Sequence, residues 1–263
     1  MKSVREFAAA KSAGRKIVVV TAYDAWSARL LRDTPVDAVL VGDSAMMVMH
    51  GERDTLGATV DLMELHTRAV VRGAPGKFVI ADFPFLAVRK GAAHALDAAA
   101  RLLRAGAEAV KVEGVRGHAK VIQQMVESGI PVMGHLGLQP QSIHAAGGYV
   151  VRGRSAAEAA QLREDAAALE AAGAFALVLE CVPQKLAGEI TRGLTIPTIG
   201  IGAGAGCDGQ VLVLHDLLGL TPDFGARFVR RFADGAALVT KGVTRYAAAV
   251  RGGKFPAGKE SFS

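Results

Sequence analysis

The sequence is poor in cysteine and in aromatic side chains. Among its 263 residues only Cys181 and Cys207 are cysteines, and aromatic residues make up 5%. The two cysteines have neither the spacing of a zinc site nor the number that a disulfide framework needs, so we expect a protein of the reducing cytoplasm. With so few aromatic residues, the interior must consist of Ala, Val, Leu and Gly, which suits helices packed closely on parallel strands.

Segments that would direct the chain to a membrane are also missing. No apolar run approaches the ~20 residues of a membrane span, and residues 1–16 lack the continuous apolar centre of a signal peptide. The net charge is +6, but the basic residues are spread along the chain. The densest cluster, Arg227, Arg230 and Arg231, is too short for a nucleic-acid surface. We therefore expect neither a membrane nor a nucleic acid as a partner.

What the sequence contains is a regular alternation of short apolar runs and helical patterns. Eight runs rich in Val and Ile are each bounded by turn residues, as is typical of strands buried on both faces. They cover residues 16–21, 37–42, 77–82, 109–113, 131–135, 175–180, 196–200 and 210–214. Alternating elements imply parallel strands with right-handed crossovers, and eight units favour a closed barrel over an open sheet. We predict one (β/α)8 TIM-barrel domain over residues 1–263, close to the typical length of about 250 residues.

Helical patterns and their capping signals support this arrangement. Three clear patterns cover residues 92–105, 121–128 and 156–172. Ser155 and Glu158 have the spacing of a capping box at the start of the third pattern. Ser3 and Glu6 have the same spacing near the N-terminus, where we expect a short helix that caps the barrel.

Polar side chains occur at the carboxyl ends of the predicted strands. In chain order they are Asp43, Ser44, Asp82, Lys111, Glu113, His135 and Glu180. In a barrel all these strand ends open on one face, where active sites are found. Lys111 and Glu113 are two residues apart in one strand and therefore point the same way. If these faces look into the barrel, several carboxylates converge near its mouth.

Converging carboxylates favour a bound cation. Buried acids repel one another and lose hydration, and a divalent ion offsets both costs. Because the candidate ligands are oxygens without a Cys/His cluster, a hard ion is expected, Mg²⁺ first among the divalent ions that would fit. A 2-oxo acid can chelate such an ion through its carboxylate and keto oxygens, and the ion then stabilises an enolate.

Each of these residues also has a purely structural interpretation. Asp43 or Asp82 could be a helix N-cap. Lys111 could pair with a neighbouring acid, and His135 could be a hydrogen-bonded core histidine. Glu180 is harder to explain in this way because it follows a fully apolar run, and a carboxylate there suits a general base.

Three further features leave alternatives open. The run GIGAG at residues 200–204 could be a phosphate-binding loop or a tight turn beside a substrate. The Gly-rich connection 137–154 is long enough for a functional loop. Cys181 is interpreted as a small buried hydrophobe.

Long stretches of the chain resemble the ketopantoate hydroxymethyltransferase family. The stretches are TAYDAWSARL from Thr21, VLVGDSAMMVMHG from Val39, HTRAVVRGAP from His66, ADFPF from Ala81, RAGAEAVKVEG from Arg104, IPVMGHLGLQPQSIHAAGGYVVRGR from Ile130, LEAAGAFALVLECVP from Leu169 and IGIGAGAGCDGQVLVLHD from Ile199. Runs of this length in this order are far more specific than a short motif. The resemblance implies a TIM barrel of the phosphoenolpyruvate/pyruvate type.

The resemblance also implies a reaction. Members transfer a hydroxymethyl group from 5,10-methylenetetrahydrofolate to 3-methyl-2-oxobutanoate, giving ketopantoate and tetrahydrofolate on the way to pantothenate and coenzyme A. They use Mg²⁺ and assemble as large homo-oligomers, often decamers.

Site residues follow from the same resemblance. Asp43 and Asp82 match direct Mg²⁺ ligands that also contact the substrate, and Glu113 matches an acid associated with the metal. Ser44 and Lys111 match residues that contact the substrate carboxylate. His135 matches an active-site histidine, and Glu180 matches the proton acceptor.

Two other functions fit parts of the pattern. A lyase or mutase of the phosphoenolpyruvate mutase/isocitrate lyase type would share the barrel, the Mg²⁺ and the enolate chemistry. Such enzymes usually carry a loop with a K-K-C-G-H-like motif, and neither cysteine lies in that context. A non-catalytic barrel that binds folate or phosphate ligands would not need the carboxylate cluster and Glu180, and a turnover assay separates it from an enzyme.

Overall fold

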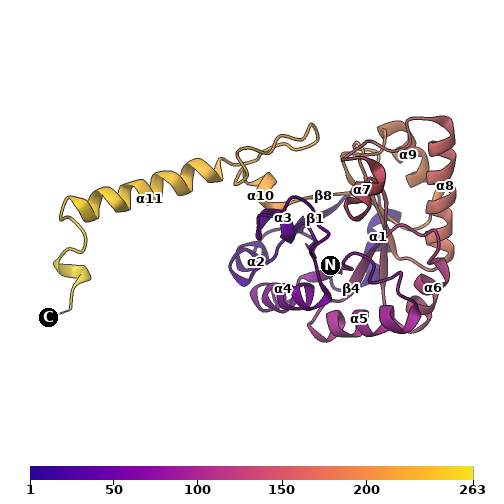
Figure 1. The fold of residues 1–263 in the computed structure, drawn as a ribbon, viewed down its shortest axis with the longest axis horizontal. Helices are drawn as coiled ribbons and strands as arrows, with labels where there is room; N and C mark the ends of the chain where they lie inside the picture. Colours follow the sequence, from indigo (N-terminus) through magenta and orange to yellow (C-terminus); the bar gives the residue numbers. More distant parts are fainter. Residues whose placement is uncertain (263) are drawn as a thin grey trace. The chain divides into compact units, whose positions relative to one another are not determined.

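The computed structural model describes residues 1–262 and divides into two compact units, Met1–Val213 and Leu214–Ser263. The first unit is a closed barrel in which eight parallel strands pair in chain order, with helices around them (Figure 1). The strands are β1 (Ile17–Thr21), β2 (Ala38–Val41), β3 (Phe78–Asp82), β4 (Ala109–Glu113), β5 (Val132–Gly137), β6 (Ala176–Glu180), β7 (Thr198–Ile201) and β8 (Gly209–Leu212). The predicted barrel and all eight predicted strands are confirmed. All eight strands lie in the first unit. That a single domain spans residues 1–263 stays a prediction.

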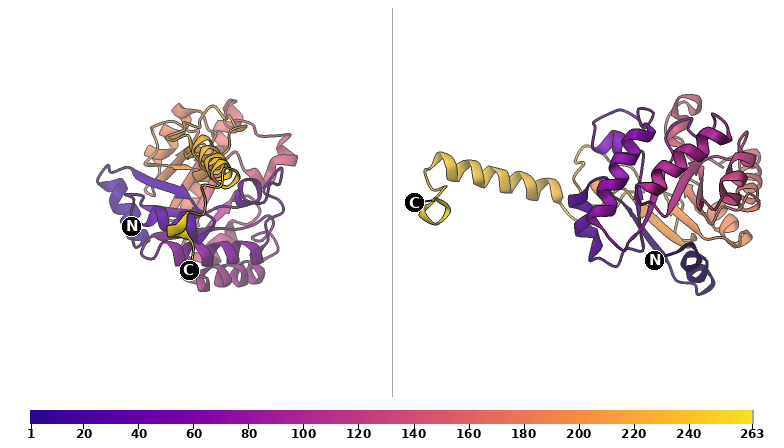
Figure 2. Two further views of the ribbon diagram at one scale, coloured as in Figure 1. Left: turned by 90° about the vertical axis from the view of Figure 1, so that its left-hand side faces the viewer. Right: turned by 90° about the horizontal axis from the view of Figure 1, so that it is seen from below.

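Six longer helices follow the strands and cover the outside of the barrel (Figure 2). They are α2 (Ala25–Arg32), α4 (Val60–Gly73), α5 (Ala92–Arg104), α6 (Ala119–Glu127), α8 (Ala156–Ala171) and α9 (Gln184–Gly193). Short helices α3 (Ala45–Val48), η1 (Pro140–Ser142) and α7 (Ile143–Ala146) lie in the connections after β2 and β5. The helices predicted from the three clear patterns correspond to α5, α6 and α8.

Only one of the two predicted capping boxes forms. At the start of α8, the Ser155 side chain accepts a hydrogen bond from the Glu158 N–H, and the Glu158 carboxylate accepts one from the Ser155 N–H. At the N-terminus the prediction is wrong, because the Ser3 side chain makes no capping hydrogen bond. There the Ser3 carbonyl accepts the Glu6 N–H instead, so backbone alone closes the first turn.

The N-terminal helix α1 (Val4–Ser12) caps the amino-terminal end of the barrel, as predicted. Phe7 is fully buried and packs edge-on against Phe78 at the start of β3 and Phe175 just before β6, with ring centroids 5.1 and 5.2 Å apart. Aromatic pairs of this geometry contribute beyond the area they bury. Three of the few aromatic residues therefore close the end of the barrel opposite to the predicted site.

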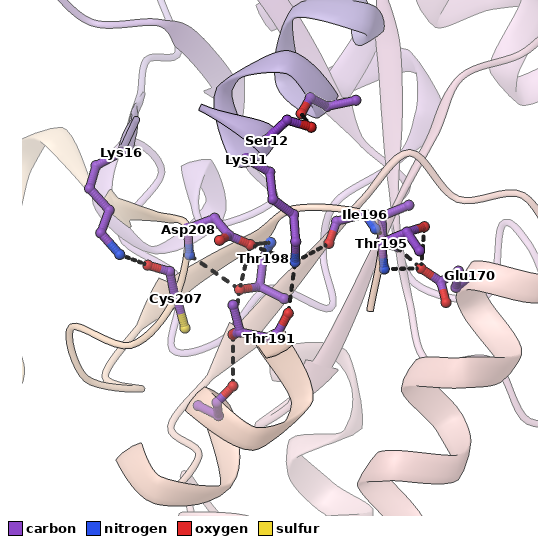
Figure 3. A network of polar contacts seen from close by, with 12 residues as sticks. Lys11, Ser12, Lys16, Glu170, Thr191, Thr195, Ile196, Thr198, Cys207 and Asp208 are labelled. Carbon is purple, nitrogen blue, oxygen red and sulfur yellow. Dashed lines mark hydrogen bonds and ion pairs between the residues drawn. The ribbon is translucent and has the colours of Figure 1, made fainter. Parts of the chain in front are cut away.

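A polar network ties the same helix to the last two strands (Figure 3). The Lys11 ammonium donates to the carbonyls of Thr191 and Ile196, at 2.7 and 3.0 Å, and lies 3.1 Å from the Asp208 carboxylate. Asp208 in turn accepts the backbone N–H of Thr198 at 2.9 Å. One lysine thus satisfies two backbone carbonyls and one acid between α9, β7 and β8.

The second unit contains α10 (Leu214–Leu217), α11 (Gly235–Arg251) and η2 (Gly258–Glu260). Asp234 caps α11 by accepting the N–H of Ala237. No residue of α11 is buried, and Val239, Val243 and Tyr246 form an exposed apolar stripe at helical spacing. Within residues 1–262, no helix has the length and apolar character needed to cross a lipid bilayer.

Candidate active site

The polar side chains singled out in the sequence meet at the carboxyl ends of β2 to β6. Strand register sets two of the pairs, since Asp82 on β3 lies beside Lys111 on β4, and Glu113 on β4 lies beside His135 on β5. Asp43, Asp82, Lys111, Glu113 and His135 are all buried, and Glu180 is half-buried at the end of β6. The predicted convergence of these side chains at one end of the barrel is confirmed.

Lys111 and Asp82 form a buried ion pair. The Lys111 Nζ lies 2.6 Å from each carboxylate oxygen of Asp82. Burial alone would lower the pKa of Lys111, but the charges of Asp82, Glu113 and Asp43 raise it, so the lysine is cationic. The alternative that Lys111 pairs with a neighbouring acid therefore describes this structure. Two acceptor oxygens with further lone pairs remain on Asp82 for another ligand.

Asp43 lies two residues beyond the end of β2, next to Asp82. Its backbone N–H points to Asp82 Oδ2 at 3.4 Å, and its own Oδ2 accepts a hydrogen bond from Gln141. Burial, followed by the charges of Asp82 and Glu113, raises the pKa of Asp43 well above its usual range. The N-cap interpretation is wrong for both aspartates, because the helices that follow them begin after Ser44 and Gly91.

His135 lies between two carboxylates instead of being a hydrogen-bonded core residue. Its Nδ1 is 3.5 Å from Glu113 Oε1, and its Nε2 is 3.2 Å from Glu180 Oε2, although neither nitrogen is aligned for a hydrogen bond. Burial and Lys111 lower the pKa of His135, whereas its contacts with Glu113 and Glu180 raise it further, to about 9. The two carboxylates therefore favour the protonated, cationic imidazole.

Ser44 is held by a residue that the sequence did not single out. The Ser44 Oγ lies 2.8 Å from the hydroxyl of Tyr23, whose side chain is fully buried just beyond β1. The signal for Tyr23 in the sequence is its position two residues after a predicted strand. Tyr23 therefore holds the Ser44 oxygen in place.

Gln141, in the loop after β5, is the second residue that the sequence did not identify. Its amide Nε2 donates to Asp43 Oδ2 at 2.8 Å and to the Phe83 carbonyl at 2.7 Å, and its backbone N–H donates to Glu113 Oε2 at 3.1 Å. The length of the connection pointed to this loop, but nothing in the pattern pointed to one residue in it.

Around Glu180 the backbone is tightly packed. Gly137 pairs with Glu180 in the register of β5 and β6, has a φ of +95°, and a Cβ there would lie 2.1 Å from the Glu180 carbonyl oxygen. Cys181 follows with a φ of +48°. It is half-buried, less than predicted, and burial together with the charge of Glu180 raises the pKa of its thiol to about 11.

The GIGAG run turns directly against α9. Gly204 has a φ of +81°, and a Cβ at this position would lie 2.5 Å from the Cβ of Gln184. Its carbonyl accepts a hydrogen bond from the Gln210 side chain. These contacts fit the interpretation as a tight turn.

The donor set of the cluster fits a divalent cation. When all six groups are ionised, the cluster has a net charge of −2. Four acids contribute negative charge, Asp43, Asp82, Glu113 and Glu180, and two groups contribute positive charge, Lys111 and His135. Glu113 Oε1 is buried without a hydrogen bond, and carboxylate oxygens are what Mg²⁺ binds. Within residues 1–262, no three His, Cys, Asp or Glu side chains are grouped as a metal site, so an ion here would complete its coordination with water or substrate.

A closed barrel with charged side chains converging at the carboxyl ends of its strands defines a (β/α)8-barrel enzyme. Solved structures of the same fold include phosphoenolpyruvate phosphomutase from Streptomyces platensis subsp. rosaceus, with a TM-score of 0.65 and 14% identity over 99% of this chain and 92% of that one. They also include 2,3-dimethylmalate lyase, a member of the PEP mutase/isocitrate lyase superfamily, with a TM-score of 0.63 and 17% identity over 100% and 92%. These likenesses show the shared barrel fold, and the finer assignment to the phosphoenolpyruvate/pyruvate type stays a prediction.

Sequence similarity gives the family. The model of the ketopantoate hydroxymethyltransferase family matches residues 1–258. The 3-methyl-2-oxobutanoate hydroxymethyltransferase of Bdellovibrio bacteriovorus is 49% identical over 263 residues, covering 100% of both chains. That of Trichlorobacter lovleyi is 50% identical over 262 residues, covering 99% of this chain and 98% of the relative. The chain belongs to the ketopantoate hydroxymethyltransferase family and is an enzyme of the transferase class.

Proposed function

We propose that this enzyme transfers a hydroxymethyl group from 5,10-methylenetetrahydrofolate to 3-methyl-2-oxobutanoate, giving 2-dehydropantoate (ketopantoate) and tetrahydrofolate for pantothenate and coenzyme A biosynthesis. The observation that carries the proposal is the buried cluster of acids around Lys111 at the barrel mouth. It has the oxygen donors and the cationic groups that a metal-bound 2-oxo acid requires, in a chain whose relatives are named for this substrate.

Asp43 and Asp82 are the proposed ligands of Mg²⁺, or of another divalent ion, and Glu113 is proposed to contact it through water. Bound there, the ion supplies Lewis-acid polarisation of the keto group. Two excess negative charges make the cluster a strong acceptor for such an ion. Burial, followed by the charges of Asp82 and Glu113, raises the pKa of Asp43, and a bound cation would offset both effects.

Lys111 and Ser44 are proposed to hold the substrate carboxylate. Lys111 is cationic and buried, so its field is little screened by solvent. The Ser44 oxygen is held in place by Tyr23 at 2.8 Å. Together they fix the 2-oxo acid with its C3 towards β6.

Glu180 is the proposed general base. Its side chain keeps 17% of its surface exposed and lies 3.2 Å from His135 Nε2, so it can reach a substrate while the imidazolium holds its position. Glu180 accepts the C3 proton, and the electron pair left on C3 forms the new carbon–carbon bond to the one-carbon unit of the folate. The two carbon–nitrogen bonds of that unit break, and their electron pairs stay on the folate nitrogens. Water supplies the hydroxyl group of the product, and its remaining proton and the C3 proton go to these nitrogens, which gives tetrahydrofolate.

The proposed protein is cytoplasmic and a homo-oligomer, with a decamer as the expected state. The exposed stripe of Val239, Val243 and Tyr246 on α11 supports self-association, because exposed apolar surface of this kind marks contact regions. Light scattering coupled to size-exclusion chromatography gives the number of subunits. No membrane or nucleic acid is proposed as a partner.

Proton NMR of 3-methyl-2-oxobutanoate in D₂O tests the function. With protein and Mg²⁺, the C3 proton signal should disappear, and addition of 5,10-methylenetetrahydrofolate should give ketopantoate. EDTA should abolish both changes. Absence of exchange and of product from folded protein saturated with Mg²⁺ would contradict the proposal and shift the function to another 2-oxo acid or to a lyase.

A further inference from the structure

The connection after β5 reaches back over the barrel mouth through one residue. Gln141 lies in the middle of η1, and its hydrogen bonds go to groups on the connections after β2 and β3 and at the end of β4. At its base, the same connection is fixed by the Leu138 N–H, which donates to the Glu180 carbonyl at 2.8 Å. It therefore contacts the strand ends on both sides of β5.

We propose that Gln141 is a positioning residue that sets the orientation of both Asp43 and Glu113 and fastens the loop of residues 138–146 over the site. The proposal deepens the proposed function, since it assumes that these two acids serve a divalent cation. Gln141 itself is neither a proposed ligand of the ion nor a proposed acid or base.

The side-chain amide of Gln141 can have only one orientation here. Asp43 Oδ2 and the Phe83 carbonyl are both acceptors, so both must receive N–H groups of the amide, and its oxygen must point away. Both N–H donors are used at 2.7 and 2.8 Å. Because Oδ2 of Asp43 gives one lone pair to this bond, Oδ1 is the oxygen with more capacity for an ion.

The backbone of Gln141 acts on the second acid. Its N–H donates to Oε2 of Glu113, and Oε1 remains buried without a hydrogen bond. Pro140 precedes it and restricts the backbone of η1. One residue thus engages one oxygen of each acid, and the other oxygen of each acid accepts no hydrogen bond from Gln141.

Gln141→Met is the informative variant, because it nearly keeps the size of the side chain but removes both donors. Ser142→Ala is the matched control, since the Ser142 side chain, at the N-cap of α7, makes no capping hydrogen bond. Mn²⁺ affinity, measured by electron paramagnetic resonance of the free ion without substrate, should weaken about tenfold or more in Gln141→Met and stay unchanged in Ser142→Ala. Hydrogen exchange of residues 138–146 without metal should become faster only in Gln141→Met.

Equal Mn²⁺ affinity in wild type and Gln141→Met would overturn the proposal and leave the proposed function in place. Failure of the wild type to bind Mn²⁺ would overturn both, and it would do so without any variant. If Gln141→Met does not fold, Gln141→Asn serves the same comparison, because its amide is one methylene too short to keep both acceptors.

Discussion

The Lys111 ammonium lies 2.6 Å from each oxygen of Asp82, in a place where both side chains are almost completely buried, with exposed fractions of 4% and 1%. A residue proposed to bind substrate is thus paired with a residue proposed to bind metal. The pair keeps a buried acid neutralised before any ligand arrives. Because of this pair, a substrate that binds Lys111 and an ion that binds Asp82 must either replace the contact between the two side chains or share it.

Replacing Lys111 with Met should cost both stability and catalysis. Removing one partner of a buried pair leaves the other uncompensated, which typically costs about 3–5 kcal/mol. We expect kcat/KM to fall at least a hundredfold, with KM raised, and the free energy of unfolding to fall without Mg²⁺ and recover in part with it. Steady-state kinetics and urea unfolding with and without Mg²⁺ measure both. An unchanged KM would argue against a contact between Lys111 and the substrate carboxylate.

Replacing Asp43 with Asn should stabilise the metal-free protein. A carboxyl whose pKa is raised on folding stabilises the fold most at low pH, and that contribution is lost as the pH rises through the raised pKa. At neutral pH the amide should therefore gain on the order of 1–3 kcal/mol, and this gain should vanish near pH 4. Thermal unfolding across pH checks the prediction.

The same variant should lose the stabilisation that Mg²⁺ gives the wild type. In the wild type this stabilisation should grow with pH, because the carboxylates must be deprotonated to bind the ion. Equal Mg²⁺ stabilisation in both proteins would show that Asp43 is not a ligand.

Replacing Glu180 with Gln should separate binding from proton transfer. The isosteric amide cannot accept the C3 proton, so exchange of that proton in D₂O should slow about 10²–10⁴-fold. Mn²⁺ should still bind, because Glu180 is not a proposed ligand, and the affinity should weaken only by the loss of one negative charge of the cluster. Retained exchange would remove Glu180 from the role of base.

Cys181 should be unreactive in the folded protein. The thiolate is the nucleophile, and a thiol pKa of about 11 leaves little of it at pH 8. Iodoacetamide labelling followed by mass spectrometry should show slow modification that rises with pH, and fast modification after unfolding in urea. Rapid labelling together with loss of activity at pH 8 would instead favour a catalytic cysteine.

Lys11→Met should loosen the helix that caps the barrel. Two carbonyls and Asp208 would lose their shared donor, at a cost of about 1–3 kcal/mol. Arg32→Met is the control, since the exposed pair of Arg32 with Asp33 should contribute nothing measurable. Urea midpoints compare the two, and equal midpoints would mean that the network adds no stability.

The sequence predicted the barrel well because its strands are buried on both faces. Continuous apolar runs such as 175–180 indicate such strands. The direction of a strand is enough to predict that an acid at its end, such as Asp82, lies at the mouth of the barrel. The pairing of Lys111 with Asp82, and not with Glu113, depends on the register between β3 and β4. Register follows from closure of the whole barrel, which no local pattern contains.

Two misses have similar causes. Ser3 and Glu6 have the spacing of a capping box, but the Ser3 carbonyl closes the turn and the side chains are not needed. Gln141 was missed because a loop residue owes its contacts to groups far away in the chain, 98 positions away in the case of Asp43. Spacing rules describe neighbours along the chain, so they do not reach such contacts.

Gly137 carries no functional group, yet the close approach of its backbone to the Glu180 carbonyl leaves room for nothing larger than a hydrogen atom. Any side chain there would push away the peptide that holds the proposed base. Position 137 is therefore hard to replace although its residue is chemically silent. Substitutions of Gly137 should therefore lower activity as much as substitutions of the acids. A mutational scan interpreted only from the chemistry of the side chains would not explain that result.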